Sequence, residues 1–287
     1  MMQEFVDCHV HIASGHHAPR GWTASDTTMR RHLFLKTIER YGELKIKALR
    51  DGGDRYGAGS FFKAMAEDAG ITFTTPIFAV RKAGCYGDFL GPALAEGASI
   101  TTGLDALFRR KPDFIKIIQT GIMGLKSPGL VGGASFTSRE LGDIIKKSHD
   151  AGYKTMVHVN DAQYIMEALE AGADSIEHGY AIDDDCITAL LETGCVWVPT
   201  LSPFGNFAKA EENTLAKTAR YYFEGHQIAV KKAWALGVSI AVGSDAGAAY
   251  VPHGQGTLDE WKYLMDLGIP QEVLMENSWE LARWHQI

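Results

Sequence analysis

The sequence predicts an α/β protein in which a single (β/α)8 barrel, of the TIM-barrel type, spans residues 1–287. Two regularities lead to this prediction. Short apolar runs rich in β-branched residues alternate with longer amphipathic segments, and several of these segments end in glycine just before the next run. Because glycine adopts the left-handed conformation that ends a helix, the repeat is typical of parallel βαβ units. Eight such units in 287 residues fit a closed barrel.

The expected elements follow one another in strict alternation along most of the chain. The eight strands are expected at 4–12, 44–50, 71–80, 113–119, 154–160, 174–178, 195–201 and 238–245. The helices are expected at 29–41, 56–69, 98–110, 138–151, 161–171, 183–193, 209–236, 257–267 and 271–284. A doubly wound open sheet is the alternative, but no GxGxxG follows the first strand. Little sequence remains for a second domain.

Composition and charge narrow the class of protein. The net charge is -7 and no Lys/Arg-rich run occurs, which argues against nucleic acid or an anionic membrane as a partner. No apolar stretch approaches the roughly 18 residues of a membrane span, and the N-terminus does not have the pattern of a signal peptide. Four dispersed cysteines fit reduced thiols in the cytoplasm. We expect a cytoplasmic homo-oligomer acting on a small molecule, with 209–236 as internal packing or a subunit contact.

The first expected strand carries two histidines, in FVDCHVHI at residues 5–12. Successive side chains of a strand point to opposite faces, so His9 and His11 face the same side. Two satisfied histidines on a half-exposed strand and a pair of metal ligands both fit this motif.

Other strands end in residues that favour the second interpretation. Lys116 lies in DFIKIIQTG, His158 in MVHVN, His178 in SIEHG and Asp245 in GSDAG. Alone, each has a structural explanation: a core histidine bonded to a carbonyl, a buried ion-pair lysine, or an aspartate that caps a loop. In a barrel, however, the carboxyl ends of the strands meet at one mouth. Their convergence there favours a metal centre.

The order HxH, Lys, His, His, Asp on strands 1, 4, 5, 6 and 8 resembles the amidohydrolase superfamily, in the branch with a strand-4 lysine and two metals. The segments DFIKIIQTGIMG, HVNDAQYIMEALEAGADSIEHGYAID and GVSIAVGSDAGAAYVPHGQGTLDEWKYLMDLGIPQEVL are similar to the imidazolonepropionase/prolidase-like amidohydrolases. The similarity covers residues 5 to about 284. Most relatives carry a small β-sandwich that this sequence leaves no room for, so we expect a barrel without it.

The resemblance implies a metal-dependent hydrolase of a C–N bond in an amide, cyclic amide, N-acyl amino acid or dipeptide. It makes His9, His11 and Asp245 ligands of one divalent ion and His158 and His178 ligands of a second. Lys116 would carry a CO₂-derived carbamate between them. Zn²⁺ suits these ligands best, and Mn²⁺, Fe²⁺ or Co²⁺ also fit. A hydroxide between the ions would attack the substrate, with Asp245 as general base and acid.

Loop residues are the candidates for substrate contacts. Tyr180 is a candidate donor to the oxyanion. His253 would contact substrate or hold its own loop, and Trp22 would line an apolar pocket or pack a loop. Arg20, Arg81 and Lys126 would pair with a substrate carboxylate or lie solvated at the surface. The Gly-rich segment 120–136 around Lys126 could act as a lid.

Four other functions remain open. A hydrolytic deaminase or a lactonase could use the same metal centre. A Schiff-base aldolase-like barrel would use Lys116 as nucleophile but leaves the four histidines unexplained. A metal-binding module without activity would not require Asp245.

Overall fold

The structure is a computed structural model that describes the chain except for residues 1–3, 15–26, 94–99, 127–128, 130 and 286–287. Its strands pair only in parallel within two sheets. One sheet contains β1 (Phe5–Val10), β2 (Ile46–Asp51) and β3 (Thr72–Thr74). The other contains β4 (Ala79–Val80), β5 (Ile115–Ile118), β6 (Thr155–Val159), β7 (Ser175–His178) and β8 (Val196–Val198).

The expected last strand, 238–245, joins the two sheets but is not a regular strand. It makes a parallel bridge from Ile240 to Trp197 of β8, and the Val242 carbonyl accepts a 2.7 Å hydrogen bond from the Cys8 amide of β1. Its amides at Val242 and Ser244 donate to side chains instead of to a neighbouring strand. The segment therefore closes the barrel where predicted, without a continuous ladder.

The expected strand 71–80 is also wrong in detail, because it divides into β3 and β4. Pro76 lies in the break and has no amide hydrogen to donate, and Ile77 has a left-handed φ of 65°. The Thr75 carbonyl still accepts a 3.0 Å bond from the Asp113 amide, so this position remains next to the following strand of the barrel.

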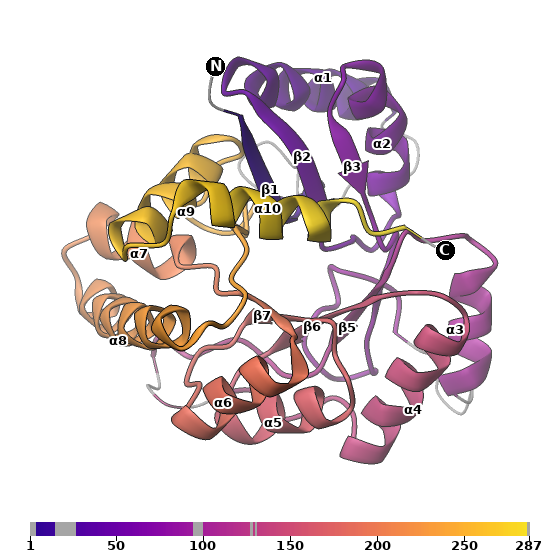
Figure 1. Ribbon diagram of the computed structural model, residues 1–287. Coiled ribbons are helices and arrows are strands. Elements are labelled where there is room, and N and C mark those ends of the chain that lie inside the picture. Colours follow the sequence, from indigo (N-terminus) through magenta and orange to yellow (C-terminus); the bar gives the residue numbers. More distant parts are fainter. Residues whose placement is uncertain (1–3, 15–26, 94–99, 127–128, 130, 286–287) are drawn as a thin grey trace.

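Helices surround the strands (Figure 1). They are α1 (Thr27–Glu43), α2 (Ala58–Asp68), α3 (Ile100–Phe108), α4 (Ser138–Asp150), α5 (Ala162–Glu170), α6 (Asp184–Thr193), α7 (Ser202–Ala210), α8 (Thr214–Leu236), α9 (Gln255–Asp266) and α10 (Gln271–Ala282). The expected helix 209–236 begins at Thr214, after an Asn213 cap. The sequence patterns did not indicate α7, whose SPFGNFAKA contains the poor helix formers Pro and Gly. Pro203 is tolerated there because it lies in the first turn.

Helix α10 covers the amino-terminal end of the barrel, in front in Figure 1. Leu281 and Trp284 pack there with inward side chains from the starts of strands, such as Val6, Phe114 and Val196. The candidate site residues come later in their strands and therefore lie toward the other end.

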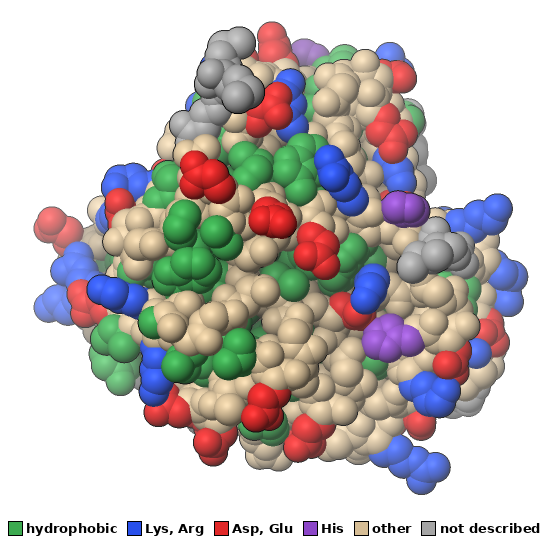
Figure 2. All heavy atoms as spheres, in the orientation of Figure 1, with side chains coloured by type: hydrophobic (Ala, Val, Ile, Leu, Met, Phe, Trp, Pro, Cys, Tyr) green, Lys and Arg blue, Asp and Glu red, His purple; other side chains and the backbone are tan. Residues whose placement is uncertain are grey.

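The face shown in Figure 2 carries basic side chains scattered among acidic ones. Among the described helices, none combines the length and the apolar character needed to cross a bilayer.

Candidate metal centre

The two histidines of β1 meet Asp245 at the mouth of the barrel. His11 Nε2 lies 3.2 Å and His9 Nε2 3.7 Å from Asp245 Oδ1, and the two rings are 5.2 Å apart. The Asp245 amide donates to the His9 carbonyl at 2.7 Å, which fixes the aspartate beside β1. One potential ligand atom from each of the three residues falls within 4.8 Å of the others. The three residues that the sequence analysis assigned to one ion therefore lie together in the structure.

Glycine at position 52 makes room for His11. A Cβ built on Gly52 would lie 2.3 Å from His11 Cε1, so any larger residue would displace the ring. This close approach explains the glycine that directly follows β2.

A second pair of histidines lies against the first group. The His158 and His178 rings are 4.5 Å apart, and the His178 ring is 4.8 Å from that of His9. His178 Nδ1 is 2.7 Å from the Thr200 hydroxyl, and His158 Nε2 is 3.3 Å from the Gly121 carbonyl. These contacts fix both rings at the wall of the same cavity.

Lys116 is buried at this cavity with its amine unsatisfied. Its side chain comes from β5, the residue is 1% exposed, and Nζ has no hydrogen-bond partner among the described residues. Burial lowers the pKa of the amine to about 8, although the charge of Glu177 opposes the shift. A buried ammonium without a partner is costly, so this position calls for a further explanation.

Burial keeps three of these histidines, His9, His158 and His178, in the neutral form. Burial lowers the pKa of His9 and of His178 well below the usual value, and it lowers the pKa of His158 to about 3. Neutral imidazole is the form that binds a metal ion.

The donor chemistry and the unsatisfied atoms both fit a metal. His9 Nε2, His11 Nδ1 and Lys116 Nζ are buried without a hydrogen-bond partner in the described chain. Imidazole nitrogens with a carboxylate oxygen are typical ligands of Zn²⁺ and related divalent ions. The residues present therefore fit a divalent ion beside His9, His11 and Asp245.

Strained backbone accompanies several of these side chains. Positive φ angles occur at His178 (66°), Thr200 (50°) and Asp245 (59°). Each of these residues lies at or just after the carboxyl end of a strand or of the segment 238–245. Such conformations are unfavourable for non-glycine residues and concentrate at functional sites. At His178 the turn interrupts the strand alternation, so that it and Glu177 both reach the barrel interior.

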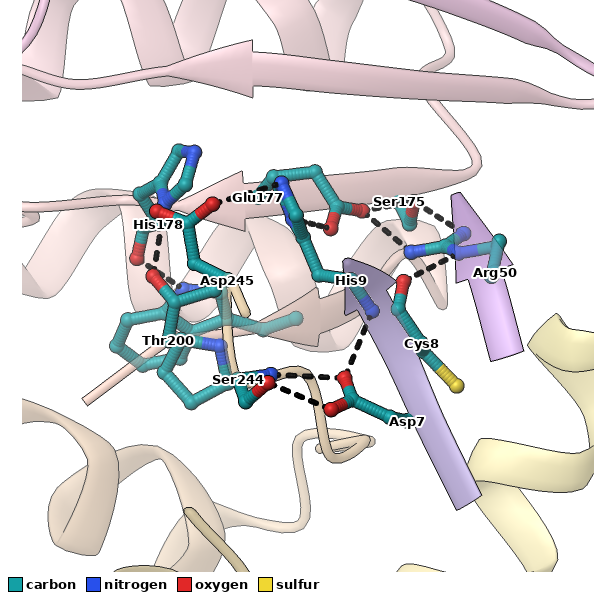
Figure 3. A network of polar contacts seen from close by, with 12 residues as sticks. Asp7, Cys8, His9, Arg50, Ser175, Glu177, His178, Thr200, Ser244 and Asp245 are labelled. Atoms are coloured by element: carbon teal, nitrogen blue, oxygen red, sulfur yellow. Dashed lines mark hydrogen bonds and ion pairs between the residues drawn. The ribbon is translucent and has the colours of Figure 1, made fainter. Parts of the chain in front are cut away.

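His9 also belongs to a buried polar network that the sequence analysis did not identify (Figure 3). Glu177 bonds His9, Arg50 and Ser175, and all four side chains are inaccessible to solvent. One feature of the sequence could have indicated this network: Glu177 is an acidic residue inside the expected strand 174–178, in SIEHG, directly before the candidate ligand His178.

The cavity in front of these residues has a volume of about 790 Å³ and mainly apolar walls. Its apolar lining includes Ile122, Met123, Leu125, Phe204, Phe207 and Leu215. Tyr86 stacks on the His158 ring at 5.4 Å. Lys126 lines the cavity as well and is exposed.

The other predicted substrate contacts have different environments. Tyr180 lines the cavity, but its hydroxyl donates to the Thr200 carbonyl at 2.6 Å, so its proton is already engaged. His253 lies outside the described cavity lining, with its ring nitrogens 2.8 Å from the Tyr41 hydroxyl and 3.0 Å from the Ser14 carbonyl. This geometry favours its loop-holding role over substrate contact.

Arg81 is buried and bonds the carbonyls of Gly91, Lys82 and Cys85. It also pairs with Asp88, so its guanidinium organises the loop after β4 rather than facing the cavity. Arg20 and Trp22 lie outside the described residues.

The class of protein follows from the barrel and the residues at its mouth. Residues 5–270 match the model of the amidohydrolase family. The chain belongs to the amidohydrolase family.

Curated relatives extend beyond the region that this chain matches. Uncharacterized proteins of Mycobacterium tuberculosis and Mycobacterium bovis are 32% identical over 146 residues, which are 49% of this chain and 39% of theirs. The ochratoxinase of Aspergillus niger is 25% identical over 287 residues, covering 85% of this chain and 58% of its own. The chain thus spans between about two fifths and three fifths of their length.

Solved structures confirm the predicted barrel fold. A Xaa-Pro dipeptidase with bound methionine aligns with a TM-score of 0.77 at 21% identity, covering 98% of this chain and 75% of that one. The Aspergillus niger ochratoxinase aligns with a TM-score of 0.76 at 19% identity, covering 96% and 69%.

Proposed function

We propose that this chain is a metal-dependent hydrolase that cleaves a C–N bond, as in an amide or a peptide. The observation that carries the proposal is the convergence of His9, His11 and Asp245 within ligand distance of one another. Family membership and the names of its relatives, a dipeptidase and an ochratoxinase, support it.

Two divalent ions, preferably Zn²⁺, fit the residues at the mouth. His9, His11 and Asp245 would hold one, and His158 and His178 the other. Lys116 would join them as a carbamate, which removes the unpaired ammonium because the amine becomes a carboxylate-like group. When bound, such ions supply a water of lowered pKa and polarise the scissile carbonyl.

Asp245 has the position of the proton carrier. Its carboxylate accepts the proton of the attacking water while the water oxygen forms its bond to the carbonyl carbon. The C–N bond then breaks, and Asp245 returns the proton to the departing nitrogen, so that acid and amine are released. The short backbone bond from the Asp245 amide to His9 keeps the carboxylate oriented during both transfers.

The cavity indicates what kind of amide fits. Its walls suit a large apolar group, and the exposed ammonium of Lys126 suits a carboxylate at the rim. An N-acyl amino acid or a dipeptide with an apolar side chain has both features. Deamination and lactone hydrolysis could use the same centre.

The amine of Lys116 also favours a second candidate function. Its unsatisfied Nζ and its pKa of about 8 are suited to a Schiff-base nucleophile. Borohydride reduction with a carbonyl substrate tests this: covalent labelling of Lys116 would favour an aldolase-like reaction, and we expect none.

The proposed hydrolase is tested by metal analysis of protein grown without chelator, together with a screen of N-acyl amino acids, dipeptides and cyclic amides. We expect bound divalent metal and hydrolysis that stops when the metal is removed. Protein with metal at the mouth that hydrolyses none of these amides would contradict the proposed substrate class. Hydrolysis that persists in metal-free protein would contradict the mechanism.

A further inference from the structure

Glu177 lies beside His9 in the buried polar network (Figure 3). Its Oε2 lies 2.7 Å from His9 Nδ1, and its Oε1 lies 2.7 Å from Arg50 Nη2 and 2.6 Å from Ser175 Oγ. The Glu177 and His9 side chains are both completely buried. These contacts form a chain of polar groups from β2 and β7 to the first metal ligand of β1.

The partners of Glu177 prevent its carboxylate from turning. Arg50 donates from Nε to the Cys8 carbonyl at 2.7 Å and from Nη1 to Ser175 Oγ at 3.1 Å. Its guanidinium lies 4.8 Å from the ring of Trp284. Because arginine only donates hydrogen bonds, Oε1 is committed to Arg50 and Oε2 is left for His9.

This arrangement determines which nitrogen of His9 carries the proton. A carboxylate only accepts hydrogen bonds, so Nδ1 of a neutral His9 must donate to Glu177. The lone pair is then on Nε2, which lies toward Asp245 and has no hydrogen-bond partner in the described chain. That lone pair is what a metal ion at the mouth requires.

Stability alone does not account for the pair of Arg50 and Glu177. A fully buried ion pair is often no more stable than well-packed apolar residues of the same volume. We propose that Glu177, locked by Arg50 and Ser175, is a positioning residue that selects the metal-binding tautomer of His9. This inference rests on the proposed metal centre and assigns a role to residues outside its ligand set.

Glu177→Gln gives a sharp test because Arg50 dictates the orientation of the new amide. The amide oxygen must face Arg50, so the amide NH₂ faces His9 and donates to Nδ1. The proton of His9 then moves to Nε2. We expect ¹⁵N NMR of the metal-free protein to show this change at His9, identified by its absence in His9→Asn. We expect Zn²⁺ affinity, measured with a competing chromophoric chelator, to fall by about 10- to 100-fold.

Glu260→Gln is the matched control. Glu260 is equally buried, but its carboxylate accepts from the Leu201 and Ser202 amides and the Ser202 hydroxyl at the start of α7. We expect it to leave the His9 tautomer and the Zn²⁺ affinity unchanged. Glu177→Asp keeps an acceptor-only group and should retain the wild-type tautomer.

The wild-type spectrum alone can overturn the inference, even if Glu177→Gln does not fold. A proton on Nε2 of His9 in metal-free wild type would do so, and so would an unchanged tautomer in folded Glu177→Gln. An equal loss of Zn²⁺ affinity in Glu260→Gln would mean that the loss in Glu177→Gln comes from general destabilisation of the fold. That result would also overturn the inference. If the tautomer changes as expected but wild type binds no Zn²⁺, the positioning role stands and the proposed metal-dependent function fails.

Discussion

Replacement of Lys116 by Met should stabilise the metal-free protein. The lowering of the Lys116 pKa from 10.5 to about 8 corresponds to about 3 kcal/mol, at about 1.4 kcal/mol per pH unit. The amine is completely enclosed, so solvent does not screen this penalty. Methionine fills a similar volume without a charge, so Lys116→Met should raise the free energy of unfolding by about 3 kcal/mol at pH 7.

The pH dependence of this stability difference distinguishes an effect of the lysine charge from an effect of side-chain packing. Between pH 8 and 10.5 the unfolded chain binds the lysine proton more tightly than the folded chain, so wild-type stability rises with pH in this window. Below pH 8 the full penalty is present. The advantage of Lys116→Met should therefore shrink to under about 1 kcal/mol at pH 10.

Urea unfolding of both metal-free proteins in CO₂-depleted buffer measures this difference. Lys146→Met is the matched control, because Lys146 is largely exposed and pairs only with Asp150 among the described residues, and its replacement should change stability by less than about 0.5 kcal/mol. Equal or lower stability of Lys116→Met at pH 7 would refute the reasoning. An advantage that persists undiminished at pH 10 would assign the effect to packing.

Three further outcomes are expected. Asp245→Asn should keep much of its bound metal but lose about 10²- to 10⁴-fold in kcat, measured beside Asp266→Asn, and full activity would contradict the proton-carrier role. Phe207→Ala should lower kcat/KM about tenfold for substrates with a large apolar group, and an equal loss for small substrates would contradict the apolar-wall assignment. At a fixed concentration of dissolved CO₂, the rate at which Zn²⁺ reactivates the metal-free protein should rise with pH and level off above about pH 8, because only the neutral amine of Lys116 takes up CO₂. A rate that does not depend on pH would argue against carbamate formation.

Side-chain periodicity and barrel topology explain why so much of the site was predictable. The spacing of His9 and His11 determines their common face, and parallel strands bring Lys116 and His158 to the same end. Asp245 is next to His9 because the last segment pairs with β1. These relationships depend on the backbone alone.

Features that depend on individual side-chain hydrogen bonds were not predictable in the same way. In the segment 238–245, the amides of Val242 and Ser244 donate hydrogen bonds to the side chains of Ser278 and Asp7. These amides are therefore not available for a regular ladder of hydrogen bonds with a neighbouring strand. Glu260 satisfies two amides at the start of α7, which offsets the weak helix propensity of its sequence. Glu177 meets Arg50 across 127 positions of sequence, and local patterns do not contain that pairing.

Loop residues were the least predictable because their backbone has no repeating pattern. Arg81 and His253 have the chemistry of substrate ligands, but neighbouring carbonyls and hydroxyls satisfy them in the folded chain. Whether a polar side chain is free for substrate depends on partners brought close by the fold.

The mouth of the barrel combines features that destabilise the metal-free fold, and the free energy of metal binding would offset their cost. A buried polar atom without a partner, such as His9 Nε2, costs about 1–3 kcal/mol, and a strained φ such as that of Asp245 costs a similar amount. An ion present at a thousand times its Kd returns about 4 kcal/mol through linkage. Wild type with Zn²⁺ should therefore unfold at higher urea than without it, whereas Lys116→Met should gain little from Zn²⁺. If Zn²⁺ stabilised both proteins equally, the ion would be binding away from Lys116, and the amine would have no part in the centre.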